Sequence, residues 1–230
     1  GAVARPSAIS TETTTTIEPT EAKIHIHDPR FDKLVAMYQP KSRVPASISV
    51  FDIAGLVKGA SSGAGLGNAF LSHISAVDGI FHVVRAFSNE DVIHEEGSVD
   101  PIRDMEIING ELVAKDLQHL DKVVEGINGK LKRVNQAGGG KVLQEEKDLV
   151  ERLRAMLLEG RFVRDGTWAG KEIEKLNEYH LMTAKPTVYL ANIGRDDYIK
   201  KKNKWLPKIS AYVAEHGGGP IIPFSAEFEG

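Results

Sequence analysis

The chain has 230 residues, and its 32 acidic residues outnumber its 29 lysines and arginines only slightly, which gives a net charge of −3. These proportions are typical of a globular protein and argue against one that coats nucleic acid through bulk charge, although they permit a local basic patch. Cysteine is absent, which excludes disulfides, thiolate zinc sites, iron–sulfur clusters and a cysteine nucleophile.

The sequence also lacks signals for membrane insertion or export. No stretch approaches the roughly 20 apolar residues of a membrane span. Residues 1–21 have neither the apolar core nor the preceding basic cluster of a signal peptide. We therefore expect a cytoplasmic protein that makes no membrane contact, and we expect a monomer.

The first part of the chain combines strand patterns with a glycine-rich segment. Residues 23–27 predict a short strand, residues 28–45 hold a short amphipathic patch, and residues 47–53 predict a β-branched strand. Residues 55–67 contain five glycines, which predicts a loop whose backbone can approach a ligand closely. Residues 68–77 predict a helix.

The middle of the chain carries the strongest helical pattern. Residues 79–87 predict an apolar, buried parallel strand, and Asp100 followed by Pro101 predicts the start of a helix. Apolar residues then recur at spacings of three and four over 112–134 and over 142–157, on either side of a glycine turn. We interpret these segments as an antiparallel helical hairpin. Because polar residues dominate outside a narrow seam, a projecting arm is favoured over two ordinary domain helices.

The last part of the chain alternates helices with apolar strands. Residues 171–180 predict a helix and residues 186–193 a strand that is apolar on both faces. Residues 196–217 predict a helix that Gly217 ends, and residues 220–225 predict a strand. Strands that alternate with helices predict a largely parallel α/β sheet.

Residues able to bind a nucleotide follow three of the predicted strands. Asp52 could hold Mg²⁺ through water, and the amide of Gly55 could contact a terminal phosphate. The side chain of Asn192 could read a purine edge, and so could the backbone amides at Ser225 and Ala226. A strand-end turn would explain each pattern alone, but their order along the chain is that of a nucleoside-triphosphatase domain.

Long blocks of the sequence resemble the Obg-like ATPase (YchF) family of P-loop NTPases. The resemblance covers nearly the whole chain from Thr15 onward, in blocks at residues 16–19, 52–60, 65–74, 97–104, 181–186, 201–206 and 222–225. The longest two read Asp-Ile-Ala-Gly-Leu-Val-Lys-Gly-Ala and Gly-Leu-Gly-Asn-Ala-Phe-Leu-Ser-His-Ile. The resemblance implies a Ras-like P-loop NTPase domain of the α/β class, with a mostly parallel sheet and an inserted antiparallel helical arm.

The same resemblance implies domain boundaries and an activity. Residues 1–110 and 166–230 would form the nucleotide-binding domain, and residues 111–165 would form the arm. A member of this family would bind ATP with Mg²⁺, hydrolyse ATP in preference to GTP, and act in association with the ribosome.

Matching positions in the family imply the roles of individual residues. Thr16 and Asp52 would lie near Mg²⁺, and Gly55 would meet the γ-phosphate. Leu56 stands where many GTPases keep a water-orienting glutamine, and the family's proposed substitute, a mobile catalytic histidine, falls on His94. The residues beside the base would be Asn192, Ile193, Ser225 and Ala226.

Three departures from the family pattern are visible. No G-x-x-x-x-G-K-[ST] phosphate loop is present, because residues 1–7 resemble its beginning but Ala8-Ile9-Ser10 stand where Gly-Lys-Ser would come. Either the sequence omits residues of the natural chain or the protein is a truncated paralogue. Arg195 occupies a position that is usually Glu, unless Asp196 takes that role. The chain ends at Gly230 without the family's C-terminal TGS domain.

A binding module is the second function that the sequence supports. Without the phosphate-loop lysine, the protein would keep its fold but lose hydrolysis. It would then contact the ribosome or RNA through the basic arm, at Lys130, Lys132 and Arg133, and through the cluster from Lys200 to Lys204. A solvated helix face explains that cluster equally well. His82, inside a predicted strand, is interpreted as a core histidine.

Overall fold

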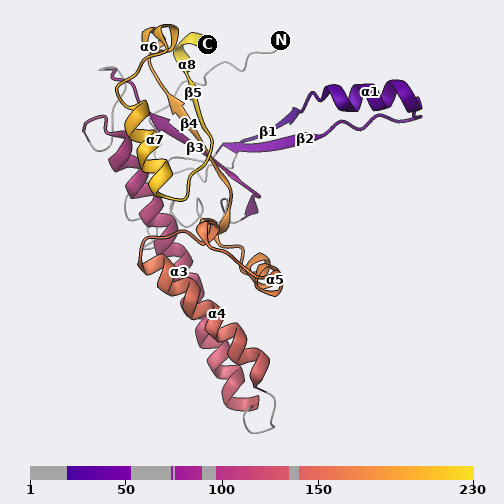
Figure 1. Cartoon of the computed structure of the whole chain (residues 1–230), viewed down its shortest axis with the longest axis vertical. Helices are drawn as coiled ribbons and strands as arrows, with labels where there is room; N and C mark the ends of the chain where they lie inside the picture. The colour runs from indigo at the N-terminus through magenta and orange to yellow at the C-terminus, as the bar shows by residue number, and fades with distance from the viewer. Residues whose placement is uncertain (1–19, 53–73, 75, 90–96, 135–139) are drawn as a thin grey trace. The chain divides into compact units, whose positions relative to one another are not determined.

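The computed structural model describes residues 20–52, 74, 76–89, 97–134 and 140–230 (Figure 1). The chain forms two compact units. Of the described residues, 20–52 form the hairpin unit, and 74, 76–89, 97–134 and 140–230 form the sheet unit. None of the described helices is both long enough and apolar enough to cross a membrane.

The hairpin unit is a pair of strands with a helix between them in sequence. Strands β1 (Thr20–His25) and β2 (Ser47–Asp52) pair in antiparallel register. Helix α1 (Pro29–Tyr38) begins after Asp28, whose carboxylate accepts a hydrogen bond at 2.9 Å from the backbone two residues on. The amphipathic patch predicted in this segment is therefore part of a complete helix.

The sheet unit contains a parallel sheet of β3 (Ile80–Arg85), β4 (Thr187–Asn192) and β5 (Ile221–Phe224), in that order. Arg85, the last residue of β3, pairs with Asn192, the last residue of β4, and the end of β5 also pairs with Asn192. The three strands thus end at one edge of the sheet, where α/β proteins commonly bind ligands. The predicted parallel sheet is confirmed.

Two helices cover one face of this sheet. They are α3 (Pro101–Val134), through its first turns, and α7 (Leu206–Glu215). The buried cluster comprises Val84, Ala86, Met105, Tyr189, Ala191, Ile193, Ile209, Tyr212 and Val213. On β3, however, Phe81 and Val83 are exposed. The expectation of a fully buried strand is wrong here, because alternate side chains point to opposite faces and the two helices cover only one.

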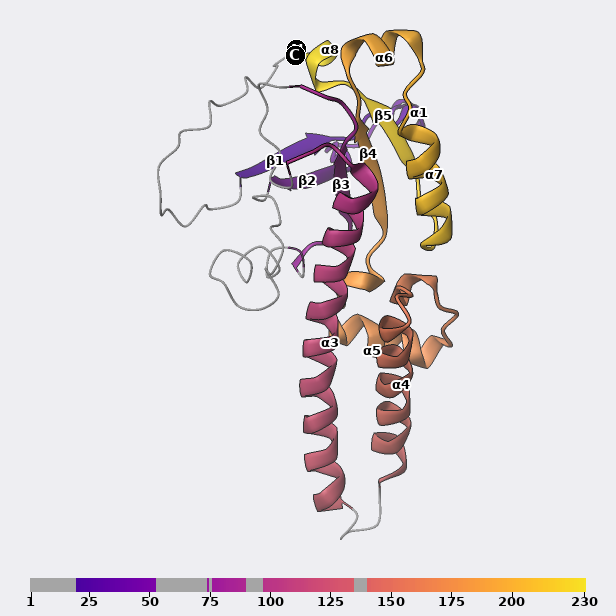
Figure 2. The same ribbon diagram turned by 90° about the vertical axis from the view of Figure 1, so that its left-hand side faces the viewer.

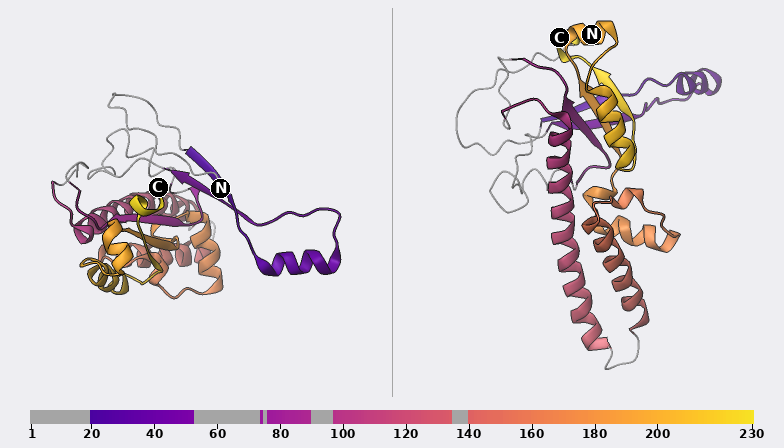
Figure 3. Two further views of the ribbon diagram at one scale, coloured as in Figure 1. Left: turned by 90° about the horizontal axis from the view of Figure 1, so that it is seen from above. Right: turned by 60° about the vertical axis from the view of Figure 1, so that its left-hand side comes forward.

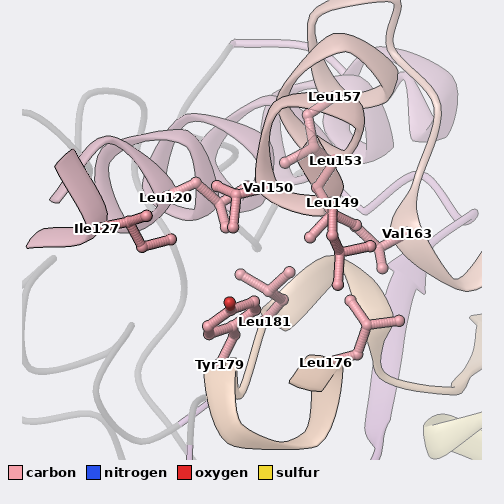
Figure 4. Packing of buried hydrophobic residues seen from close by; sticks show 10 residues of the cluster. All are labelled: Leu120, Ile127, Leu149, Val150, Leu153, Leu157, Val163, Leu176, Tyr179 and Leu181. Atoms are coloured by element: carbon pink, nitrogen blue, oxygen red, sulfur yellow. The ribbon is translucent and has the colours of Figure 1, made fainter. Parts of the chain in front are cut away.

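Helices α3 and α4 (Lys141–Leu158) form the predicted antiparallel hairpin. They run side by side in Figure 2 and Figure 3. Apolar side chains of both helices and of α5 (Gly170–Tyr179) with its flanking turns meet in one core (Figure 4), made of Leu120, Ile127, Leu149, Val150, Leu153, Leu157, Val163, Leu176, Tyr179 and Leu181. Because α3 is continuous over 34 residues, it serves both the sheet and the hairpin. The predicted domain boundaries at residues 110 and 165 stay predictions.

A buried carboxylate joins the helical hairpin to the sheet. Asp116 of α3 accepts a hydrogen bond from Met182 N at 3.0 Å. It accepts two more from Thr183, from N at 2.8 Å and from Oγ1 at 2.7 Å. Met182 and Thr183 belong to a short 3-10 turn that leads into β4. Burial raises the pKa of Asp116, and the hydrogen bonds from Thr183 and Met182 oppose that rise.

The single helix predicted over residues 196–217 is wrong, because two helices occupy this segment. Helix α6 (Arg195–Lys200) is followed by its C-cap residue Lys201, which adopts a left-handed backbone conformation with φ 50°. Helix α7 begins five residues later, with Pro207 in its first turn, where proline fits because its missing N–H is not needed. Gly217 ends α7 as predicted, with φ 84°, and a Cβ there would collide with a neighbouring aspartate carboxylate.

Candidate functional site

The segments that follow β4 and β5 are joined at the carboxyl edge of the sheet. Ala226 N donates a hydrogen bond to Asn192 Oδ1 at 3.1 Å. Ile193 N donates to Phe224 O at 2.9 Å. Because Ser225 lies between these two contacts, the structure brings together Asn192, Ile193, Ser225 and Ala226, the residues predicted beside a base. Their role in binding one stays a prediction.

Two polar groups in this cluster differ in their access to a ligand. Asn192 Oδ1 already accepts from Ala226, so Nδ2 is the part of that amide that can donate to a ligand atom. The Oγ of Ser225 is buried and finds no hydrogen-bond partner in the described part of the chain. A buried hydroxyl without a partner is uncommon in native proteins, but this one has almost no surface that a ligand could contact.

A hollow of about 660 Å³ opens beside these segments. Its walls include Phe87 after β3, Arg195 and Asp197 of α6, and Asn203 and Trp205 before α7. Four basic and three acidic side chains line it, so the local charge nearly balances. The four residues predicted beside the base do not line the hollow, but their neighbours in sequence, Gly194 and Glu227, do.

The Glu227 carboxylate lies next to Arg195, which occupies the position that was expected to be Glu. Arg195 N donates to Glu227 Oε2 at 3.4 Å, and Glu227 belongs to the short helix α8 (Ala226–Glu229) and lines the hollow. Sequence reasoning gave no role in this site to the carboxylate of Glu227 or to Asn203. An asparagine among lysines gives no sign of burial, and the approach of α8 to α6 depends on how the strands pair.

The residues predicted around the phosphates are mostly outside the described part of the chain. Thr16, Gly55 and His94 all fall there. Asp52 is described: it is the exposed last residue of β2, in the hairpin unit. Its carboxylate is the hard oxygen ligand that Mg²⁺ prefers. Within the described residues, no group of three or more acidic or histidine side chains is placed to hold a metal ion.

Polar contacts also occur near the opposite, amino edge of the sheet. The Arg164 guanidinium donates to Thr187 Oγ1 and to the Tyr189 hydroxyl, both at 3.2 Å. Burial lowers the pKa of His82 on β3 to about 4, and the positive charge of Arg164 adds to this effect. His82 is therefore neutral at physiological pH, and its side chain is half-buried.

The basic surfaces predicted from the sequence are exposed. Lys200 and Lys202 are exposed at the rim of the hollow. Lys204 Nζ lies 5.2 Å from the centre of the Trp205 ring, and Lys208 Nζ lies 5.0 Å from it. The lysines and the arginine near the end of α3, namely Lys130, Lys132 and Arg133, are exposed as well.

Comparison with known proteins gives a consistent result. The model of a family described as 50S ribosome-binding GTPase matches residues 2–122. Obg-like ATPase 1 of Oryza sativa subsp. indica is 52% identical over 214 residues, which cover 93% of this chain and 53% of that protein. Obg-like ATPase 1 of Homo sapiens is 48% identical over 219 residues, with 93% and 54% covered.

A solved structure agrees with the sequence relatives. The YchF GTPase of Schizosaccharomyces pombe superposes with a TM-score of 0.78 at 48% identity, over 93% of this chain and 57% of that one. The chain therefore spans about half the length of the curated relatives it matches.

Proposed function

Because this chain belongs to the Obg-like ATPase (YchF) family of P-loop GTPases and has their Ras-like fold, we propose that it binds a purine nucleoside triphosphate, preferably ATP, and hydrolyses it with Mg²⁺. The observation that carries this proposal is the joining of the segments after β4 and β5 by the Ala226–Asn192 hydrogen bond. It leaves the Nδ2 donor of Asn192 for a ligand.

In this proposal, polar groups at the ends of β4 and β5 bind the base. Asn192 Nδ2 donates to an acceptor nitrogen on the purine edge, which adenine and guanine share. Arg195 disfavours guanine at this position, because a guanidinium cannot accept hydrogen bonds from the ring N–H and amino group of guanine.

The phosphate end of the proposal rests on the family resemblance. Thr16 and Asp52 would hold Mg²⁺, the amide of Gly55 would meet the γ-phosphate, and His94 would orient the attacking water. Mg²⁺, when bound, neutralises charge on the phosphates. A histidine suits the water-positioning role because its neutral ring can accept a proton from water near pH 7.

Ribosome association and a cytoplasmic location complete this proposal. The exposed basic residues near the end of α3 and the exposed lysines between Lys200 and Lys204 are the surfaces that would contact RNA phosphates. A specific observation favours a second candidate function, a ribosome- or RNA-binding module without hydrolysis. It is the absence of the Gly-Lys-Ser sequence from the phosphate-loop position, since that lysine supports the β- and γ-phosphates.

Single-turnover hydrolysis separates the two candidates. The purified protein is mixed with limiting ATP or GTP and Mg²⁺, and released phosphate is followed for the wild type and for His94→Ala. We expect faster turnover of ATP than of GTP, and a rate for His94→Ala that is lower by about a hundredfold, as for loss of a general base. An unchanged rate in His94→Ala removes that assignment, and no turnover of either nucleotide favours the binding module.

A further inference from the structure

The segment between α6 and α7 contains an asparagine whose burial contrasts with its neighbours. Its sequence is Lys201-Lys202-Asn203-Lys204-Trp205, and the three lysines are exposed. Asn203 is only 9% exposed. A polar side chain that is buried beside solvated lysines must be held by specific hydrogen bonds, because burying an unpaired amide is costly.

The side chain of Asn203 hydrogen-bonds to three separate elements. Its Nδ2 donates to Ala86 O, just after β3, at 3.0 Å, and to Asp197 Oδ2 of α6 at 2.7 Å. Its Oδ1 accepts from Trp205 N, at the start of α7, at 2.8 Å. Both amide protons and the amide oxygen are therefore used. The bond to the Asp197 carboxylate is charge-assisted and is the shortest of the three.

These contacts help to hold α6 in place, together with its contacts with α8. Six residues are too few for a helix to be stable on its own, so tertiary contacts must hold α6 in place. Asp197 is in its first turn, two residues after Arg195 and five after Asn192. A bond that fixes Asp197 against the end of β3 therefore fixes the segment 192–195 as well.

We propose that Asn203 is the positioning residue of the base site: it holds α6 against the end of β3 so that the segment 192–195 presents its polar groups to the base. This inference rests on the proposed function. Asn203 contacts neither base nor phosphate in this role. It acts through Asp197, so its loss weakens recognition of the base and leaves recognition of the phosphates intact.

The test compares ligands with and without the base. Dissociation constants of ATP and of ribose 5′-triphosphate, with Mg²⁺, are measured by calorimetry. The dissociation constant of ribose 5′-triphosphate divided by that of ATP is the ratio that reports the contribution of the base. We expect Asn203→Ala to weaken ATP binding about tenfold, the effect of about 1.4 kcal/mol, without changing the affinity for ribose 5′-triphosphate. The ratio thus falls about tenfold.

Asn109→Ala is the matched control. Asn109 is 8% exposed and donates a buried hydrogen bond to the Tyr212 hydroxyl at 3.0 Å, so its loss also removes a buried amide. Both variants lose stability, but the ratio in Asn109→Ala stays at the wild-type value. A second pair covers the case in which Asn203→Ala does not fold: Asp197→Ala lowers the ratio, whereas Asp197→Asn, which keeps an acceptor oxygen, retains most of it.

The outcomes separate this inference from the function on which it rests. A wild-type preference for ATP over ribose 5′-triphosphate that survives both Asn203→Ala and Asp197→Ala overturns the role of Asn203 alone. A wild type that binds the two ligands equally overturns the base site itself, and the role of Asn203 with it. An equal fall of the ratio in Asn109→Ala also contradicts the inference, because general loss of stability would then explain the effect.

Discussion

Single polar side chains join the elements at both edges of the parallel sheet. At the carboxyl edge, Asn192 links the segments after β4 and β5, and Asn203 links β3, α6 and α7. Near the amino edge, Arg164 donates to two residues of β4. The contacts of Asn203 and Arg164 are buried or partly buried, where a hydrogen bond is expensive to leave unmade, whereas the contact between Asn192 and Ala226 is exposed. The stability of the protein should therefore be sensitive to changes at these positions that remove a hydrogen-bond donor or acceptor or that add a charge.

His82 should make the protein less stable in mild acid. Burial, with the charge of Arg164 as a second cause, lowers the pKa of His82 from 6.5 to about 4. The unfolded chain takes up this proton near pH 6.5 and the folded chain only near pH 4, so stability is complete above pH 6.5 and falls as the pH decreases toward 4. The loss from this one group approaches about 3 kcal/mol.

Urea denaturation between about pH 7 and about pH 4 measures this effect. In His82→Gln, which has no imidazole to protonate, the free energy of unfolding should fall less steeply with decreasing pH than in the wild type. His25→Gln, at an exposed position of β1, serves as the control and should keep the wild-type slope. The interpretation is wrong if wild type and His82→Gln show the same slope.

At the scale of elements, the helical hairpin depends on its attachment to the turn before β4. Helix α3 runs from the sheet into the hairpin without a break. The Asp116 carboxylate accepts hydrogen bonds from the backbone N–H groups of Met182 and Thr183. These two N–H groups are buried with the turn. The hairpin core in Figure 4 and this attachment are separate sources of stability, because one is apolar and the other polar.

Removing the Asp116 carboxylate should be costly. Asp116→Ala leaves two buried backbone N–H groups without an acceptor, and we expect the free energy of unfolding to fall by about 3 kcal/mol. Asp121→Ala is the matched control on the same helix. Asp121 pairs with Arg154 at 2.7 Å but its side chain is 53% exposed, so its loss should cost less than about 1 kcal/mol. Equal losses for the two variants in urea denaturation would refute a special role for Asp116.

At the scale of the whole molecule, regular patterns in the sequence predicted the architecture well. The alternation of strands and helices predicted the parallel sheet, and recurrence of apolar residues at three and four predicted α3 and α4. Parallel pairing then brings together residues that are 34 positions apart, Asn192 and Ala226, and this juxtaposition follows from the order of the strands.

Features that depend on distant partners could not be predicted in this way. The break between α6 and α7 arises from a left-handed residue and from the buried bonds of Asn203, which a helical pattern does not reveal. Asp116 occupies a polar position in a helix, and its partners lie 66 and 67 residues further along the chain. Glu227 likewise approaches Arg195 only because β5 pairs with β4.

The central claim is that a purine base, preferably adenine, is held where β4 and β5 end. Displacement of a fluorescent ATP analogue by ATP and by GTP tests it in three proteins: wild type, Asn192→Ala, and Asn177→Ala, which changes an exposed asparagine of α5. ATP should displace the analogue from the wild type at lower concentration than GTP, and Asn192→Ala alone should need about tenfold more ATP, since one hydrogen bond to the base is lost. Displacement by GTP at lower concentration than ATP, or wild-type affinity in Asn192→Ala, would contradict the claim.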